Sequence, residues 1–149
     1  MPLAGFLAKG DALNDTPSPA EKGKAKFDWV SQRYSCSLPA VFKELRTQIE
    51  QDVKTRNGLR PNNAPYEFSL VDHNGGFRVL LKGKELEMGV SFSLGEHAIL
   101  VRDDKGVEMF AVTLTFDDQG ECRLKVNGEN CSYWQVRRMA LEELMFHSY

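Results

Sequence analysis

The chain has 149 residues, of which 42% are hydrophobic and 27% are charged, and this composition is typical of a globular rather than a disordered protein. Its length fits one domain, because single domains commonly hold ~100–150 residues. The formal net charge of −2 lacks the strongly basic balance of a dedicated nucleic-acid binder. We therefore expect one soluble domain and no nucleic-acid partner.

The beginning of the chain predicts a tail followed by a helix. Residues 1–18 are predicted as a flexible N-terminal tail, and residues 19–149 as a single α+β domain. Ser18-Pro19-Ala20-Glu21 has the form of a capping box with proline at the first helical position. A helix over 20–34 is expected, with one apolar side made of Phe27, Val30 and Tyr34.

A second helix is marked more clearly. Ser37 can cap its start and Pro39 fits its first turn, while Asn57-Gly58 predicts a left-handed stop. Apolar residues recur at steps of three or four, as on the buried side of an amphipathic helix: Leu38, Val41, Phe42, Leu45, Ile49 and Val53.

From Tyr66 to Val126 the apolar pattern changes to a period of two, which is typical of strands with one buried face. The runs are separated by short turns, among them Asn127-Gly128 and the Asp-Asp-x-Gly loops 103–106 and 117–120. The two aspartate loops fit a type I turn followed by a left-handed glycine. Loops this short allow only antiparallel neighbours. We expect a meander of about six strands, and the facing of His97–Arg102 stays open because both of its sides are apolar.

The chain closes with a third helix. Ser132-Tyr133-Trp134-Gln135 forms a second capping box, and the helix should run to about His147. Its apolar stripe consists of Val136, Ala140, Leu141, Leu144 and Met145. Trp134 is expected to be a core anchor, because tryptophan buries a large area. The predicted fold is α+β: two N-terminal helices, the antiparallel meander, and a C-terminal helix packed on one sheet face.

The three cysteines, Cys36, Cys122 and Cys131, have no CxxC spacing. This pattern favours free thiols in a reducing, cytoplasmic setting. One alternative is a cross-strand disulfide between Cys122 and Cys131, which flank a predicted turn. No stretch approaches the ~20 apolar residues that a membrane span needs, so no membrane partner is expected.

The sequence predicts no catalytic residue, no metal site and no cofactor. His73, His97 and His147 are scattered without the spacing of a metal motif. Cys131 precedes the capped start of the last helix, where a thiol can be activated, but no partner base can be assigned. The Asp-Asp pairs are explained by turn formation.

The candidate interface lies on the second face of the predicted sheet. Its centre should carry small and hydroxylated side chains rather than the charges of an ordinary solvated face: Ser91, Ser93, Ala111, Thr113 and Thr115. Such a patch can receive a protein partner, a second copy of the chain, or the N-terminal tail. Threonine is also simply a good strand former, so the alternative of a plain solvated sheet remains open.

Three function classes follow from these observations. The first is a non-enzymatic binding or assembly module that uses the sheet face or an edge strand. The second is a carrier of an apolar small ligand, because strands 66–126 with the final helix resemble the helix-grip arrangement, in which a curved sheet wraps a helix around a cavity. The bulky inward side chains Phe68, Phe77, Phe92, Phe110 and Phe116 argue partly against such a cavity. The third is an enzyme with an unrecognised site.

Overall fold

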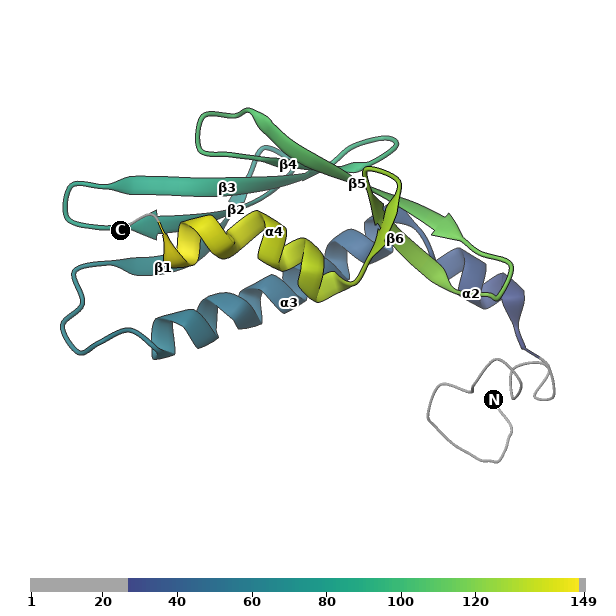
Figure 1. Cartoon of the computed structure of the whole chain (residues 1–149), viewed down its shortest axis with the longest axis horizontal. Helices are drawn as coiled ribbons and strands as arrows, with labels where there is room; N and C mark the ends of the chain where they lie inside the picture. Colours follow the sequence, from purple (N-terminus) through teal and green to yellow (C-terminus); the bar gives the residue numbers. More distant parts are fainter. Residues whose placement is uncertain (1–26, 148–149) are drawn as a thin grey trace.

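The structure is a computed structural model that describes residues 27–147 (Figure 1). Its helices are α2 (Trp29–Ser35), α3 (Leu38–Gly58) and α4 (Tyr133–Phe146). Its strands are β1 (Glu67–His73), β2 (Gly76–Lys82), β3 (Glu87–Leu94), β4 (Ile99–Arg102), β5 (Glu108–Phe116), β6 (Cys122–Val126) and β7 (Glu129–Cys131).

The strands form one antiparallel sheet of seven strands in chain order, β1 to β7. The α+β class and the antiparallel meander are therefore confirmed. The predicted number of about six strands missed β7, which has only three residues and pairs Leu124 with Cys131. A strand this short shows no alternation of apolar and polar residues, so the period-two pattern does not reveal it.

The turns have the predicted chemistry. Asn127 and Gly128 join β6 to β7 with positive φ angles of 55° and 81°, as a two-residue type I′ turn requires. Gly106 and Gly120 end the two Asp-Asp-x-Gly loops with φ angles of 82° and 78°. In both loops the first aspartate accepts two backbone N–H groups through one carboxylate oxygen, which confirms its role as a turn former.

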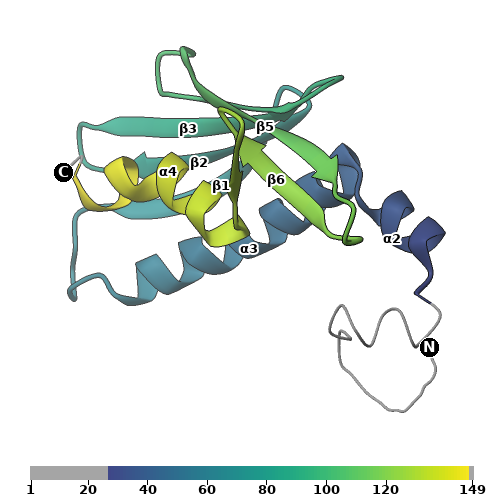
Figure 2. The same cartoon turned by 45° about the vertical axis from the view of Figure 1, so that its right-hand side comes forward.

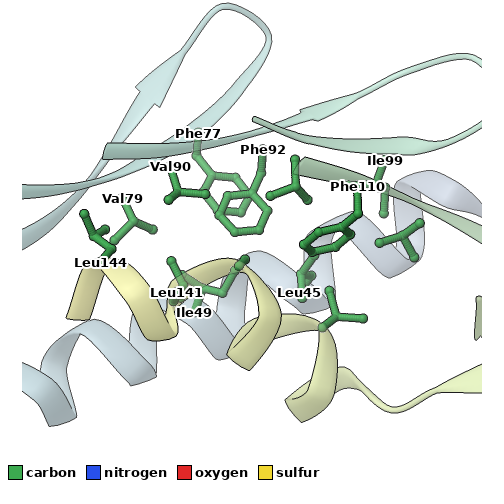
Figure 3. Close-up of a cluster of buried hydrophobic side chains, with 14 of the residues drawn as sticks. Leu45, Ile49, Phe77, Val79, Val90, Phe92, Ile99, Phe110, Leu141 and Leu144 are labelled. Carbon is green, nitrogen blue, oxygen red and sulfur yellow. The ribbon is translucent and has the colours of Figure 1, made fainter. Parts of the chain in front are cut away.

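Helices α3 and α4 lie side by side on the same face of the sheet (Figures 1 and 2). The core fills the layer between them and the sheet, and Figure 3 shows side chains from both layers pointing toward one another. The facing of β4, which the sequence left open, is decided here: Ile99 and Val101 are fully buried in the core cluster. The predicted packing of the C-terminal helix on one sheet face is confirmed.

Aromatic rings occupy the centre of this layer. The rings of Phe77 and Phe92 stack with centroids 4.8 Å apart, and Phe42 of α3 contacts Phe77 at 5.3 Å. Phe68, Phe77 and Phe92 are each at most 1% exposed. The space beneath the sheet at these rings is therefore taken by the protein's own side chains.

Helix α3 begins as predicted but ends differently. The Ser37 side chain accepts the Ala40 N–H at 3.3 Å, which confirms the N-cap. At the other end the predicted left-handed stop is wrong, because Leu59 caps the helix in the right-handed region. The Asn57 side chain instead donates to the Phe68 carbonyl at 2.7 Å and accepts the Phe68 N–H at 2.9 Å. The amide thus covers part of the open edge of β1.

Helix α2 is shorter and more exposed than predicted. It starts after Asp28, whose carboxylate accepts the Ser31 N–H at 3.1 Å, so Phe27 precedes the helix. Val30 and Tyr34 are 58% and 83% exposed, so these two residues of the predicted apolar side are not buried, whereas the half-buried Phe27 ring lies against Gly120. The predicted tail 1–18, the capping box at Ser18 and the range 20–26 lie outside the described residues.

The cysteines differ most from the prediction. Cys36 and Cys122 form a disulfide with Cα atoms 5.4 Å apart, and Cys131 is free. The expectation of three free thiols is wrong, and so is the alternative pairing of Cys122 with Cys131. A separation of 86 positions along the chain gives no local signal, because the fold alone brings the end of α2 to the start of β6. None of the helices among residues 27–147 is both long and apolar enough to cross a bilayer.

Candidate binding surfaces

The outer face of the sheet does not gather the five predicted interface residues into one neutral patch. The register places Ser93 beside Leu100, and Leu100 beside Ala111, in one row. Thr113 and Thr115 lie beyond the end of the short β4, opposite Lys125 and Arg123 of β6. A leucine and two basic residues therefore interrupt or border the small-residue surface.

Arginines also cross this face. Arg78 and Arg102 stand on either side of Ser91 in the strand register. The Arg102 guanidinium donates to the Ser93 hydroxyl at 3.2 Å, and Arg78 pairs with Asp104 at 2.8 Å. Several of the polar groups on this face thus satisfy one another within the chain.

A second surface is the outward side of α4, where four residues follow each other at steps of four, three of them exposed and Glu142 partly buried. We name this row the α4 ridge: Trp134, Arg138, Glu142 and Phe146. Trp134 and Phe146 are 54% and 59% exposed, and Arg138 forms an ion pair with Glu142. The prediction of Trp134 as a core anchor is wrong. It shares a helix face with the buried Leu141, but at the first turn of α4 that face borders a groove rather than the core.

Two hollows flank the ridge. The α3–α4 groove has a volume of about 390 Å³ and is lined mainly by apolar atoms, including those of Leu59, Leu141 and Met145. The β7–α4 groove has a volume of about 550 Å³ and is lined in part by Glu129 and Glu143. Trp134, Arg138 and Glu142 line both grooves, so the ridge is the wall between them.

Polar contacts fix α4 against α3. Arg137 reaches across the seam, where it pairs with Asp52 at 2.8 Å and donates to the Gln48 side chain. Burial raises the pKa of the Asp52 carboxyl, and the charge of Arg137 opposes this shift. Burial also raises the pKa of the Tyr133 hydroxyl, with the negative charge of Glu44 adding to the effect. The seam is therefore partly shielded from water.

The C-terminal end of α4 is held by a buried arginine. Arg56 of α3 is only 7% exposed, and its Nε donates to the Met145 carbonyl at 3.0 Å. Its guanidinium carbon lies 5.0 to 5.7 Å from the ring centroids of Tyr66, Phe68 and Phe146. A cation at the last carbonyls of a helix is favourable, and the aromatic faces stabilise it further.

A third exposed apolar surface lies on α2, where Trp29 is 61% exposed. This helix has seven residues and none of them is buried. Neither of the two grooves beside α4 is lined by a residue of α2. Exposure alone therefore distinguishes α2 poorly from an ordinary solvated helix.

The candidate chemical groups of the sequence stay apart. His73 is exposed at the end of β1, the His97 side chain is 90% exposed, and the His147 Nε2 atom lies 3.6 Å from a Glu142 carboxylate oxygen. Within residues 27–147, no three His, Cys, Asp or Glu side chains come together in a way that could hold a metal ion. Cys131 is half-buried, and its thiol contacts the Glu129 carbonyl at 3.7 Å.

Comparison of the chain with protein-family models, curated proteins and solved structures detects no significant match. The functional interpretation therefore rests on the surfaces themselves. Sequence reasoning missed the α4 ridge because its apolar members were assigned to the core or left unassigned. The signal that could have found it is the row of bulky and charged residues at steps of four beside the buried stripe.

Proposed function

We propose that this protein is a non-enzymatic binding or assembly module that engages a protein partner through the α4 ridge. The observation that carries the proposal is the half-exposed Trp134, which stands between two grooves. Tryptophan and arginine dominate the binding energy of protein interfaces, and the ridge offers Trp134 next to Arg138.

The ridge is built on a rigid frame, which favours a binding role. The capping box holds the first turn of α4 through the Ser132 and Gln135 side chains. Arg137 ties the middle of the helix to α3, and Arg56 ties its end. A surface that is already ordered loses less conformational entropy on binding, so more of the contact energy remains as affinity.

The other candidates have less support. A carrier of an apolar ligand needs space beneath the sheet, where Phe77 and Phe92 stack in contact. An enzyme needs titratable groups that act together, and the histidines lie on separate elements. The sheet-face interface at Ser91, Ser93, Ala111, Thr113 and Thr115 stays a prediction. A cytoplasmic location also stays a prediction, and the Cys36–Cys122 disulfide weighs against it because such bonds persist mainly in oxidising compartments.

The proposal is tested by photo-crosslinking in cells that make the protein. A photoreactive amino acid replaces Met139, which is 42% exposed on α4 beside the ridge, and in a parallel sample it replaces the exposed Glu67 on β1. We expect a crosslinked protein adduct from position 139 and not from position 67. Trp134→Ala should reduce the adduct at least about tenfold, since truncating an interface tryptophan commonly costs about 2 kcal/mol or more of binding energy.

The matched control is Trp29→Ala, because Trp29 is similarly exposed but lines neither of the two grooves beside α4. It should leave the adduct from position 139 unchanged. Equal adducts from positions 139 and 67, or equal loss in both tryptophan variants, would contradict a binding role for the ridge.

A further inference from the structure

The order of side chains along the α4 ridge makes it complementary to a second, antiparallel copy of itself. From the N-terminal to the C-terminal end it reads aromatic, basic, acidic, aromatic, with Trp134, Arg138, Glu142 and Phe146 at equal steps of four. Residues four apart are neighbours on a helix surface. The Arg138 and Glu142 side chains are 64% and 41% exposed, so the charges as well as the rings reach the surface.

When a second copy of α4 lies antiparallel to the first, aromatic residues face aromatic residues and opposite charges face each other. Trp134 then faces Phe146 of the partner subunit, and Arg138 faces Glu142 of the partner subunit. Both pairs are centred at the level of Ala140, so a single two-fold axis generates all four contacts. We propose, on the basis of the binding role argued above, that the partner is a second copy of this chain and that two α4 ridges pack antiparallel.

The charges specify the direction of this packing. In the antiparallel arrangement, the two Arg138–Glu142 ion pairs form a cluster in which the signs alternate. A parallel arrangement in register would set Arg138 against the same arginine and Glu142 against the same glutamate. Like charges brought together in a partly dry interface are unfavourable, so the parallel alternative is disfavoured.

The α3–α4 groove provides a seat for the aromatic ends. Phe146 lines it together with Leu59 and Met145, and Leu59 is 71% exposed. Trp134 of the partner subunit, placed against Phe146, would cover these apolar atoms. Rows of residues at i±4 on two helices pack against each other in the commonest class of helix pairs.

The size of the ridge sets the expected strength. Helix α4 has 14 residues and is therefore ~21 Å long. A contact made mainly by one such helix is smaller than the ~800 Å² per partner of a standard interface. The dimer should therefore be in equilibrium with the monomer, with a dissociation constant in the micromolar range.

Sedimentation equilibrium of the full chain, from about 1 to 500 µM, measures this equilibrium. We expect the mass to rise with concentration from 16.9 kDa toward twice that value. Arg138→Glu should weaken self-association at least about tenfold, because it sets two carboxylates against each other twice across the axis. Glu142→Arg should weaken self-association to the same extent, because it sets two guanidinium groups against each other twice across the axis.

An equimolar mixture of the Arg138→Glu and Glu142→Arg variants should recover the wild-type association. In that mixed pair every cross-axis contact again joins opposite charges, and neither variant needs to dimerise alone. The matched control is Thr113→Arg on the outer sheet face, which should leave the wild-type equilibrium unchanged.

The outcomes separate the two proposals. A wild-type chain that stays monomeric over this range, or a dimer that Thr113→Arg breaks and Arg138→Glu does not, overturns the antiparallel ridge dimer. A monomer whose crosslink from position 139 joins a different protein, and depends on Trp134, would leave the binding role intact while refuting the second copy as partner. Failure of the mixed pair to associate also contradicts the proposed register.

Discussion

Helices α2 and α4 both carry an exposed tryptophan, but they are attached to the molecule in different ways. Helix α4 contributes five buried residues to the core. Its Arg137 pairs with Asp52 of α3, and Arg56 of α3 donates a hydrogen bond to the Met145 carbonyl near the C-terminal end of α4. Helix α2 contributes no buried residue. Its end is joined to the sheet through the disulfide at Cys36, at the end of the molecule where the β5–β6 hairpin lies (Figures 1 and 2).

The difference shows why an exposed aromatic residue needs a structural context before it indicates a site. Trp29 and Trp134 are exposed to similar extents, 61% and 54%. Only Trp134 stands on a fixed helix between grooves that can receive a partner's side chains. The predictions below test this contrast in how the two helices are held.

The largest expected effect comes from removing the covalent link at α2. Cys122→Ser should lower the free energy of unfolding by about 3 kcal/mol, because the crosslink closes a long loop and restricts the unfolded chain. Urea unfolding under non-reducing conditions measures the loss. Cleavage by trypsin after Arg33 should also become faster, since the end of α2 is released.

Cys131→Ser is the matched control, because Cys131 carries the free thiol. It should lower the free energy of unfolding by less than about 1 kcal/mol, because the change neither opens a cavity nor breaks a crosslink. An equal loss in the two variants, or three reactive thiols in the unfolded oxidised protein, would show that α2 is not held by a disulfide.

A smaller effect is expected from the N-caps of the two helices. Ser132→Ala removes the side chain that accepts the Gln135 N–H at 3.3 Å and should destabilise the fold by about 1 kcal/mol. Asp28→Ala removes the corresponding cap of α2 and should change stability much less than Ser132→Ala does, because no residue of α2 is buried. Urea unfolding compares the two, and equal effects would remove the contrast between the helices.

The smallest effect is a difference in pH dependence between two aspartates. Burial raises the pKa of Asp52 in the α3–α4 seam, so the stability it contributes is present at low pH and is lost as the pH rises above 3.8 through its folded pKa. Hydrogen bonds from Ser31 lower the pKa of Asp28 at the start of α2, so its contribution is lost as the pH falls below 3.8.

Urea unfolding of the wild type, Asp52→Asn and Asp28→Asn between about pH 3 and pH 7 measures how the free energy of unfolding of each protein depends on pH. The advantage of the wild type over Asp52→Asn should shrink as the pH rises, and its advantage over Asp28→Asn should shrink as the pH falls. If both stability differences changed with pH in the same direction, Asp52 in the α3–α4 seam would be as exposed to water as Asp28 at the start of α2.

Much of the fold could be predicted because its signals are local. The alternation from Tyr66 onward identified the buried side of the strands, and Phe77, Val79 and Phe92 are indeed inside. Strand β7 escaped because three residues carry no period. The left-handed end of α3 was predicted wrongly because Asn57 has a tertiary partner, the backbone of Phe68.

The candidate site was less accessible to sequence reasoning than the fold. Trp134 was assigned to the core because tryptophan buries a large area, and its helical phase, which is that of the buried Leu141, does not argue against this assignment. Its exposure depends on how α4 lies against α3 at the first turn. The interface residues Ser91 and Ser93 were placed on the correct sheet face, but the arginines that border them come from neighbouring strands whose register the sequence does not specify.

By itself the sequence determined the order and type of the elements other than β7, the turns at Asn127-Gly128 and at the two aspartate loops, the caps at Ser37 and Ser132, and the inward face of most strands. These features depend on backbone preferences and on burial patterns within a few residues. The tertiary structure alone decided that Cys36 meets Cys122, that Arg56 lies buried at the end of α4, and that Trp134 borders a groove. Each of these contacts joins parts of the chain that are far apart or depends on the relative placement of two helices, and packing in three dimensions determines both.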